Sequence, residues 1–219
     1  MKYKHIFFDF DGTLADSMTG VADATKYALA KMGVPTNNEY GGVNFRRYLG
    51  PPLRFTFSEL LPAPAEEDIN RAITFYRERY QGGAMMDGTF LFEGVADTLE
   101  ILKDRGYRLY TASSKPEMFI ARIAEKLGIA RFFSGMYGAM TDGTRETKED
   151  VLIHAMKTAG CAVADSIMIG DRKYDLEASG ALGMDCIAVT YGYGDLEELL
   201  RYSPVFVAHS PVEIAEFLI

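Results

Sequence analysis

Short apolar runs recur along this chain, and segments with helical periodicity separate them in its later part. Val95, Leu99 and Leu102, for example, have the spacing of one buried helix face. Short strands that alternate with amphipathic helices are typical of a parallel sheet covered on both faces. The sequence therefore predicts an α/β fold with a doubly wound, Rossmann-like parallel sheet. The strand-like runs are residues 3–9, 107–112, 166–169, 184–190 and 205–208.

Residues 16–88 interrupt this alternation. Apolar residues there follow helical spacing, and proline- and glycine-rich breaks such as residues 50–52 and 62–64 permit only short helices, about four in number. We therefore predict a core formed by residues 1–15 and 89–219, with an all-helical domain of residues 16–88 inserted after the first strand. The two junctions, near residues 15–17 and 86–88, are candidate hinges.

Charge and composition limit the possible partners and location. The chain has 219 residues and a net charge of −8, so nucleic acid and anionic membranes would be repelled. No run approaches the ~18 apolar residues of a membrane span, and the start does not resemble a signal peptide. Cys161 and Cys186 lie in apolar surroundings and are interpreted as free thiols. These features favour a cytoplasmic protein.

Two carboxylates, Asp9 and Asp11, follow the first strand-like run, and Gly12 marks its end. Ligands of parallel α/β sheets bind beyond the carboxyl ends of the strands. Paired carboxylates there can hold a hard cation such as Mg²⁺ or do nucleophilic and acid–base work. Taken alone, however, the pair is more typical of turn or helix-capping aspartates.

A second candidate site follows the run 107–112, where Ser113, Ser114 and Lys115 precede Pro116. Proline suits the first turn of a helix, and hydroxyls with free amides at a helix start form an anion site. Ordinary helix capping by Ser114 is the alternative.

Two further sites complete the set. Lys148 lies in the first turn of a predicted helix, where a cation opposes the helix dipole, so an anion should face it; a solvated lysine is the alternative. Asp171 and Asp175, four residues apart after the run 166–169, should share one face of an opening helical turn; simple capping is the alternative. Jointly, carboxylates, hydroxyls and a lysine suit phosphoryl transfer.

These four ordered motifs resemble those of the haloacid dehalogenase-like (HAD) hydrolases. The helical insertion is similar to the C1-type cap of that family, and residues 50–53 and 114–116 are similar to its phosphoglycolate phosphatase-like branch. The dehalogenases lack the second aspartate of the first motif, so Asp11 favours phosphate-ester chemistry. The matching residues are Asp9, Asp11, Gly12, Thr13, Ser113, Lys148, Gly170, Asp171 and Asp175.

The resemblance implies a role for each catalytic residue. Asp9 attacks phosphorus and forms an aspartyl-phosphate, while Asp11 protonates the leaving oxygen and then takes a proton from water. Ser113 and the amides near it bind the phosphoryl oxygens, with Thr111 as the alternative hydroxyl. Lys148 neutralises the nucleophile and the phosphate.

The resemblance also implies a Mg²⁺ cofactor. Asp9, the backbone carbonyl of Asp11, and Asp171 would be its ligands, and Asp175 would support them. The site would hydrolyse a small phosphorylated metabolite, with the cap closing over it.

Ser114 and Lys115 complete the expected substrate site. In the cap, Arg46, Arg47 and Arg54 are candidates for contacting a carboxylate or second phosphate of the substrate.

Two other functions stay open. A phosphomutase would use the same aspartyl-phosphate, and a receiver-like signalling module would carry a long-lived one. Residues 191–194 (YGYG) follow a strand and are interpreted as a turn, with a place at the mouth of the active site as the alternative. We expect a monomer, because the cap would already cover the site.

Overall fold

The computed structural model describes residues 2–35 and 45–219. The chain divides into two compact units. One contains the residues up to Asp16 together with Phe90–Ile219, and the other is Ser17–Thr89. Each junction lies one residue from the boundary that the sequence predicts.

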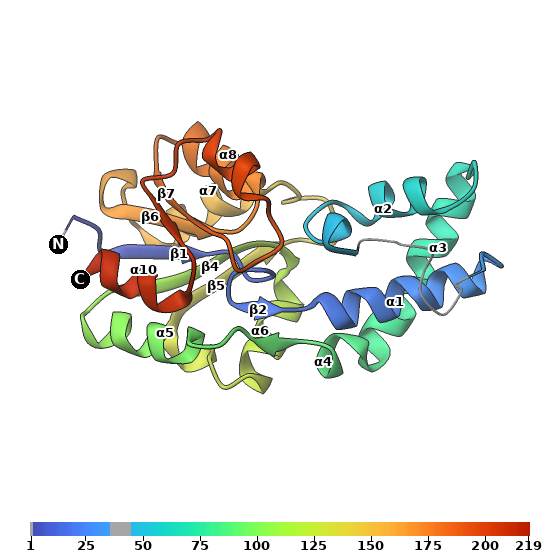
Figure 1. Ribbon diagram of the computed structural model, residues 1–219, viewed down its shortest axis with the longest axis horizontal. Helices are drawn as coiled ribbons and strands as arrows, with labels where there is room; N and C mark the ends of the chain where they lie inside the picture. The colour runs from blue at the N-terminus through green and yellow to red at the C-terminus, as the bar shows by residue number, and fades with distance from the viewer. Residues whose placement is uncertain (1, 36–44) are drawn as a thin grey trace. The chain divides into compact units, whose positions relative to one another are not determined.

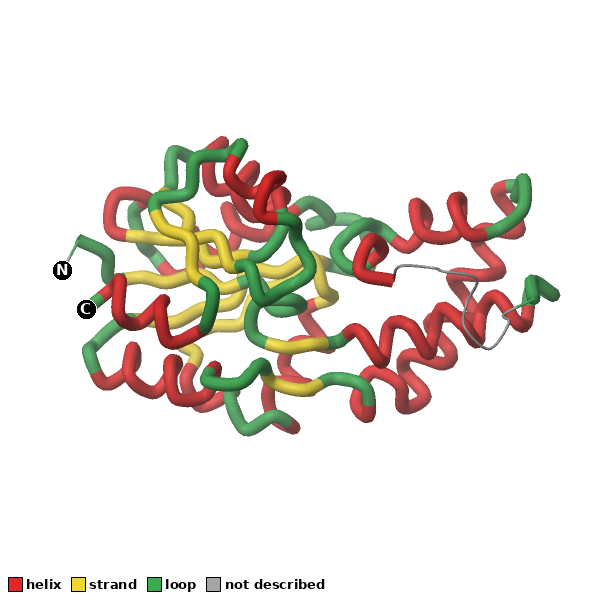
Figure 2. The backbone as a smooth tube through the Cα atoms, in the orientation of Figure 1, coloured by secondary structure: helices red, strands yellow, loops and turns green. Residues whose placement is uncertain are grey.

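The first unit is built on a six-stranded sheet with the order β5-β4-β1-β6-β7-β8. Every neighbouring pair is parallel, so all six carboxyl ends lie at one edge (Figure 2). The sheet confirms the predicted α/β class. The first strand along the chain, β1, lies inside the sheet, because it pairs with β4 on one side and with β6 on the other. The strands are β1 His5–Phe8, β4 Arg108–Pro116, β5 Phe133–Ala139, β6 Ser166–Gly170, β7 Asp185–Val189 and β8 Phe206–Ala208.

Helices cover both faces of this sheet (Figure 1). α7 (Lys148–Ala159) and α8 (Lys173–Ala181) lie on one face, and α5 (Val95–Asp104) and α10 (Pro211–Leu218) lie on the other. β1 is buried on both faces, which explains its unbroken apolar sequence. The remaining elements of this unit are α6 Glu117–Lys126, α9 Leu196–Leu200 and the short 3₁₀ helices η4 Ala130–Phe132 and η5 Val163–Asp165.

The second unit is helical throughout its described part. α1 (Met18–Lys31) packs against α3 (Glu66–Arg79), and the rings of Phe57 and Tyr76 meet edge-on with centroids 6.2 Å apart. Gly20 allows a close backbone approach, because a Cβ there would lie 2.4 Å from the carbonyl oxygen of Ala84. The other elements are η2 Phe45–Tyr48, α2 Leu53–Leu60, the π-helical turn η3 Tyr80–Ala84 and α4 Met85–Asp87.

Three strands were not expected from the sequence. β5 reads FSGMYGA, and its small and polar residues hide the apolar pattern of a strand. β2 (Ala15–Asp16) and β3 (Phe90–Leu91) form a two-residue antiparallel pair at the junctions of the two units. Such short pairing leaves no periodic signal in a sequence.

Candidate active site

Asp9 lies immediately beyond β1, at the carboxyl edge of the sheet. Its amide donates to the carbonyl of Ile169 at 2.9 Å, which continues the β1–β6 pairing and fixes the start of the loop. Gly12 has φ +86°, and a Cβ there would lie 2.2 Å from Oδ2 of Asp171. Only glycine fits this turn, so the DFDGT loop brings Asp9 and Asp171 to the same place.

Lys148, the first residue of α7, reaches toward Asp9 and the other carboxylates of the site. Thr147 caps the helix by accepting from the amide of Asp150 at 3.1 Å, as its sequence predicts. The Nζ of Lys148 lies 2.7 Å from Oδ1 of Asp9 and 2.8 Å from Oδ1 of Asp175. It also donates to the carbonyl of Ala112 at 3.1 Å. The anion expected to face Lys148 is thus a pair of carboxylates, one from the loop after β1 and one from α8.

Asp171 and Asp175 meet, but not on one helical turn as predicted. Asp171 lies in the loop after β6, and α8 begins only at Lys173. Asp175 is in the first turn, where its Oδ2 accepts from the amide of Arg172 at 3.0 Å. The capping contact of Asp175 folds the loop back, so both carboxylates face Asp9. One ligand atom from each of Asp9, Asp171 and Asp175 lies within 4.8 Å of the others.

This cluster carries more negative than positive charge. Burial raises the pKa of Asp171 well above its usual value, and the charges of Asp9 and Asp175 raise it further. Burial also raises the pKa of Asp175 to about 6, although Lys148 opposes the shift. Burial alone would lower the pKa of Lys148, but the two carboxylates it contacts raise it. Three clustered carboxylates, two of which contact one ammonium, form a donor set that fits a hard divalent cation.

Asp11 does not belong to this group of three. Its carboxylate oxygens Oδ1 and Oδ2 accept from Nζ of Lys115 at 2.9 and 2.8 Å. The side chain of Lys115 is only 4% exposed, whereas that of Asp11 is 21% exposed. The backbone carbonyl of Asp11 as a metal ligand stays a prediction.

The hydroxyls near the end of β4 differ in what they bind. Thr111 accepts from the amide of Tyr137 at 2.8 Å and donates to its carbonyl at 3.1 Å, so it joins β4 to β5. Ser113 is 2% exposed, and its hydroxyl accepts from the amide of Lys115 at 3.2 Å. This difference favours Ser113 over Thr111 as the phosphate-binding hydroxyl.

The strand β4 is longer than the sequence predicts. It continues to Pro116 because β5 pairs with it that far, through a register shift after Ser113. Pro116, with φ −56° and ψ 129°, is extended and precedes α6 rather than occupying its first turn. Ser114 is half-buried and Lys115 is buried within this last stretch of strand.

Two of the candidate arginines of the helical unit are engaged within it. Arg47 pairs with Glu59 at 2.6 Å, and Arg54 contacts both Glu66 and Asn70. A role for Arg46, Arg47 or Arg54 in binding substrate stays a prediction.

Sequence reasoning missed the polar contacts that Arg145 and Tyr193 make in the core. Arg145 is buried, donates from Nε to the carbonyl of Gly138 at 2.7 Å, and pairs with Glu117. Residues 191–194 are a turn, as predicted, but the amide of Tyr193 donates to Oδ2 of Asp171 at 2.7 Å. The only available signal was the pair of glycines in this turn, which permits close backbone approach.

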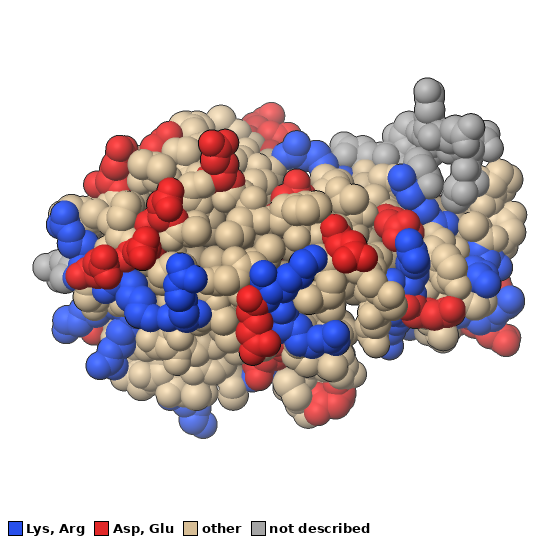
Figure 3. Space-filling view, turned by 90° about the horizontal axis from the view of Figure 1, so that it is seen from below, with Lys and Arg blue, Asp and Glu red and all other residues tan. Residues whose placement is uncertain are grey.

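Surface charge and helix length bear on the possible binding partners. On the face shown in Figure 3, Lys and Arg side chains are interspersed with Asp and Glu. Among residues 2–35 and 45–219, no helix combines the length and apolar character needed to cross a membrane.

Comparison with known proteins agrees with this geometry. A sequence model of the family described as haloacid dehalogenase-like hydrolase matches residues 6–189. A haloacid dehalogenase-like hydrolase from Streptococcus pneumoniae has a similar structure, with a TM-score of 0.90 and 32% identity, covering 100% of this chain and 99% of that one.

Curated relatives carry several names. A 5'-nucleotidase of Pseudomonas aeruginosa is 35% identical over 93% of this chain and 90% of its own length. A phosphoglycolate phosphatase of Escherichia coli O157:H7 is 32% identical over 86% of this chain and 81% of its own. The tyrosine-protein kinase PtkA of Mycobacterium tuberculosis is 36% identical over 94% of this chain and 68% of its own.

Proposed function

This chain belongs to the haloacid dehalogenase-like hydrolase family, and on that premise we propose that it is a Mg²⁺-dependent phosphatase acting through an aspartyl-phosphate on Asp9. Its phosphatase relatives support the hydrolysis of a phosphoric monoester. The observation that carries the proposal is the position of Asp9, held at the carboxyl edge by Lys148 among buried carboxylates.

In the first step, a carboxylate oxygen of Asp9 attacks phosphorus, and the bond from phosphorus to the leaving oxygen breaks. Asp11 gives its proton to that leaving oxygen. Ser113 and the backbone amides beside it would hold the phosphoryl oxygens in place. The buried ammonium of Lys148 offsets the charge that Asp9 and the phosphoryl group bring together.

In the second step, water attacks the phosphorus of the aspartyl-phosphate. Asp11 takes a proton from that water, the bond from phosphorus to Asp9 breaks, and inorganic phosphate leaves. The same carboxyl therefore acts first as an acid and then as a base. Lys115 holds Asp11 by both oxygens and so fixes its orientation.

Asp9, the backbone carbonyl of Asp11, and Asp171 would hold Mg²⁺. When bound, the cation would offset the negative charge of the carboxylates and the phosphoryl group. The contacts of Asp175 with Lys148 and the amide of Arg172 support a role for Asp175 in orienting the other groups rather than in binding the metal.

The relatives suggest the class of substrate. A nucleoside monophosphate or phosphoglycolate would each be a small phosphorylated metabolite of the kind that the curated names imply. In this proposal, residues 17–89 act as a cap that shields the reaction from water, and its arginines contribute to recognition of the leaving group.

The identity to the protein named tyrosine-protein kinase favours a second candidate. Such an enzyme would move phosphate from a nucleoside triphosphate to a tyrosine instead of to water. A phosphomutase would return the group to a sugar, and a receiver-like module would retain it. All of these differ from a phosphatase in the fate of the phosphate.

The experiment is phosphate release from phosphoglycolate, nucleoside monophosphates, sugar phosphates and pyrophosphate, with and without Mg²⁺. Asp9→Asn is compared with Asp104→Asn, a matched change at an exposed carboxylate. We expect Mg²⁺-dependent release that only Asp9→Asn abolishes. Absence of release from every ester, with phosphate appearing on tyrosine when ATP is added, would favour the kinase.

A further inference from the structure

Tyr193 connects two parts of the core through its two ends. Its backbone amide donates to Oδ2 of Asp171 at 2.7 Å, and its phenol donates to Oδ1 of Asp16 at 2.8 Å. Asp171 is fully buried, and Asp16 is the last residue of β2. Tyr193 therefore joins Asp171 of the charged cluster to Asp16, the last residue of β2.

The turn around Tyr193 lies very close to Asp171. A Cβ at Gly192 would lie 2.5 Å from Cβ of Asp171, and one at Gly194 would lie 1.8 Å from the carbonyl oxygen of Asp171. Both positions therefore require glycine, because any side chain would displace Asp171 or the turn. A backbone this close leaves Asp171 little freedom to rotate.

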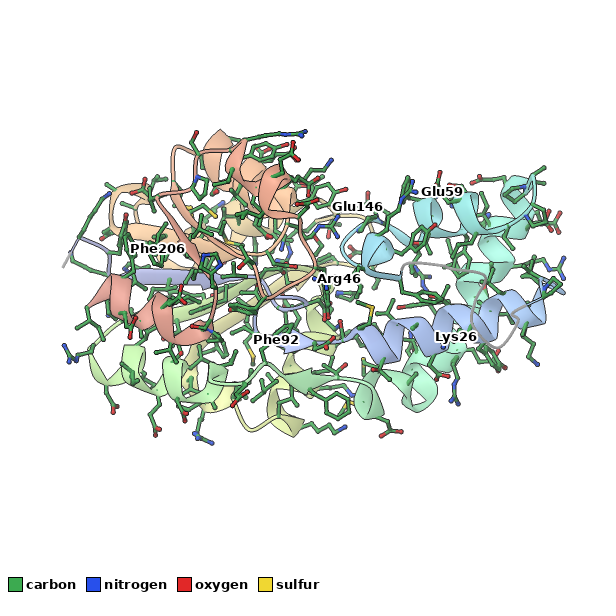
Figure 4. The ribbon with its side chains drawn as sticks, viewed as in Figure 1. Lys26, Arg46, Glu59, Phe92, Glu146 and Phe206 are labelled. Carbon is green, nitrogen blue, oxygen red and sulfur yellow. The ribbon has the colours of Figure 1, made fainter. Side chains whose placement is uncertain are left out.

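A second tyrosine anchors the same turn. The phenol of Tyr191 donates to the carbonyl of Thr13 at 3.0 Å, and the hydroxyl of Thr13 lies 3.4 Å from Oδ1 of Asp171. The ring of Tyr191 also meets that of Phe92, with centroids 5.2 Å apart. Phe92 follows β3 and is labelled in Figure 4. The turn is thus held at both of its tyrosines.

We propose that Tyr193 is a positioning residue for the cation site. Its phenol, fixed on Asp16, holds its amide against Oδ2 of Asp171 and so fixes the orientation of that carboxylate. A buried carboxylate that is already oriented loses less conformational entropy when it binds a metal. The inference rests on the proposed function only in taking Mg²⁺ as the cation of this site.

The role of the Tyr193 phenol can be tested while the backbone amide of Tyr193 is kept. Tyr193→Phe and Asp16→Ala each delete one side of the same hydrogen bond, and Tyr202→Phe is the control because its phenol binds the exposed Glu177. Calorimetric titration with Mg²⁺ should show affinity about 3–10-fold weaker for each single variant and no further loss in the double variant. Thermal unfolding with chelator checks that all variants are folded. Turnover of the weakened variants should recover at higher Mg²⁺.

Three results would overturn the inference. Mg²⁺ affinities of Tyr193→Phe and Asp16→Ala equal to those of the wild type and of Tyr202→Phe would remove the positioning role and leave the proposed function standing. Losses that add in the double variant would show that the two groups act separately. If the wild type itself binds no Mg²⁺, both the inference and the proposed cofactor are wrong.

Discussion

The ammonium of Lys115 lies within 2.9 Å of both carboxylate oxygens of Asp11, although the two residues are 104 positions apart. The lysine comes from the last stretch of β4, which the pairing with β5 extends beyond its apolar part. The contact joins the loop after β1 to the hydroxyl-bearing end of β4. It places the proposed acid–base group beside the proposed phosphate site.

Replacing Lys115 should weaken catalysis more than folding. Lys115→Met removes the group that orients Asp11, so we expect kcat to fall by roughly 10–100-fold, less than the ~10²–10⁴-fold that general acid–base catalysis itself contributes. Steady-state kinetics at saturating Mg²⁺ measure this, with the exposed Lys157→Met as control. An unchanged kcat would show that Asp11 needs no such partner.

Removing Lys148 should affect both stability and activity. Lys148→Ala leaves Asp9 and Asp175 without their shared ammonium, and breaking a buried ion pair costs about 3–5 kcal/mol. Denaturant unfolding in the presence of chelator should show this loss, and Mg²⁺ should restore part of it. Turnover should be abolished even where Mg²⁺ restores the fold. A variant with wild-type stability and activity would contradict the assigned role.

Mutation should distinguish the roles of the Ser113 and Thr111 hydroxyls of β4. Ser113→Ala should lower kcat/KM more than it lowers the free energy of unfolding, because the bond that it removes, from the amide of Lys115, is long at 3.2 Å. Thr111→Val should do the reverse, costing about 1–3 kcal/mol because the amide of Tyr137 loses its acceptor. Kinetics and denaturant unfolding of both variants test this. The opposite pattern would make Thr111 the phosphate ligand.

The raised pKa of Asp175 predicts how stability depends on pH. Its value of about 6 lies above its ordinary 3.8, so the folded state keeps a proton that the unfolded state loses between these values. The stability from Asp175 is therefore present below about pH 4 and is lost as pH rises through about 6. With chelator, the free energy of unfolding of wild type minus that of Asp175→Asn should fall across this range. A rising difference would contradict the shift.

The stabilisation that Mg²⁺ provides should increase as pH rises over the same range, opposite to the contribution of Asp175. Metal binding requires ionised carboxylates, so the rise in Tm caused by Mg²⁺ should grow between about pH 4 and pH 7. Thermal unfolding with Mg²⁺ or chelator at several pH values measures it. A rise in Tm that is independent of pH would argue against binding at this cluster.

The central sheet and part of the site could be read from the sequence. β1, β6 and β7 are largely buried strands and β8 is a partly buried one; each contains a short apolar run, and this signal needs no tertiary information. Lys148 stood out because a cation in the first turn of a helix opposes the helix dipole, and it does face carboxylates. Such local conflicts within a sequence indicate function.

Other features depend on contacts between distant segments. β5 gains its strand conformation from pairing with β4, since its own sequence is rich in small residues. The contact between Tyr193 and Asp171 uses a backbone amide, which no residue type reveals. Arg145 is buried only because Glu117 and the carbonyl of Gly138 receive it. Long-range pairing of this kind has no periodic signature.

The central claim is that Asp9 becomes phosphorylated and is then hydrolysed. Rapid quenching of the enzyme during turnover of its best ester with Mg²⁺, followed by mass spectrometry, tests it directly. We predict a phosphoryl group on the peptide that contains Asp9, formed and lost at rates consistent with turnover, and absent from Asp9→Asn. Full turnover by Asp9→Asn, or phosphorylation of a different residue at the rate of turnover, would contradict the account.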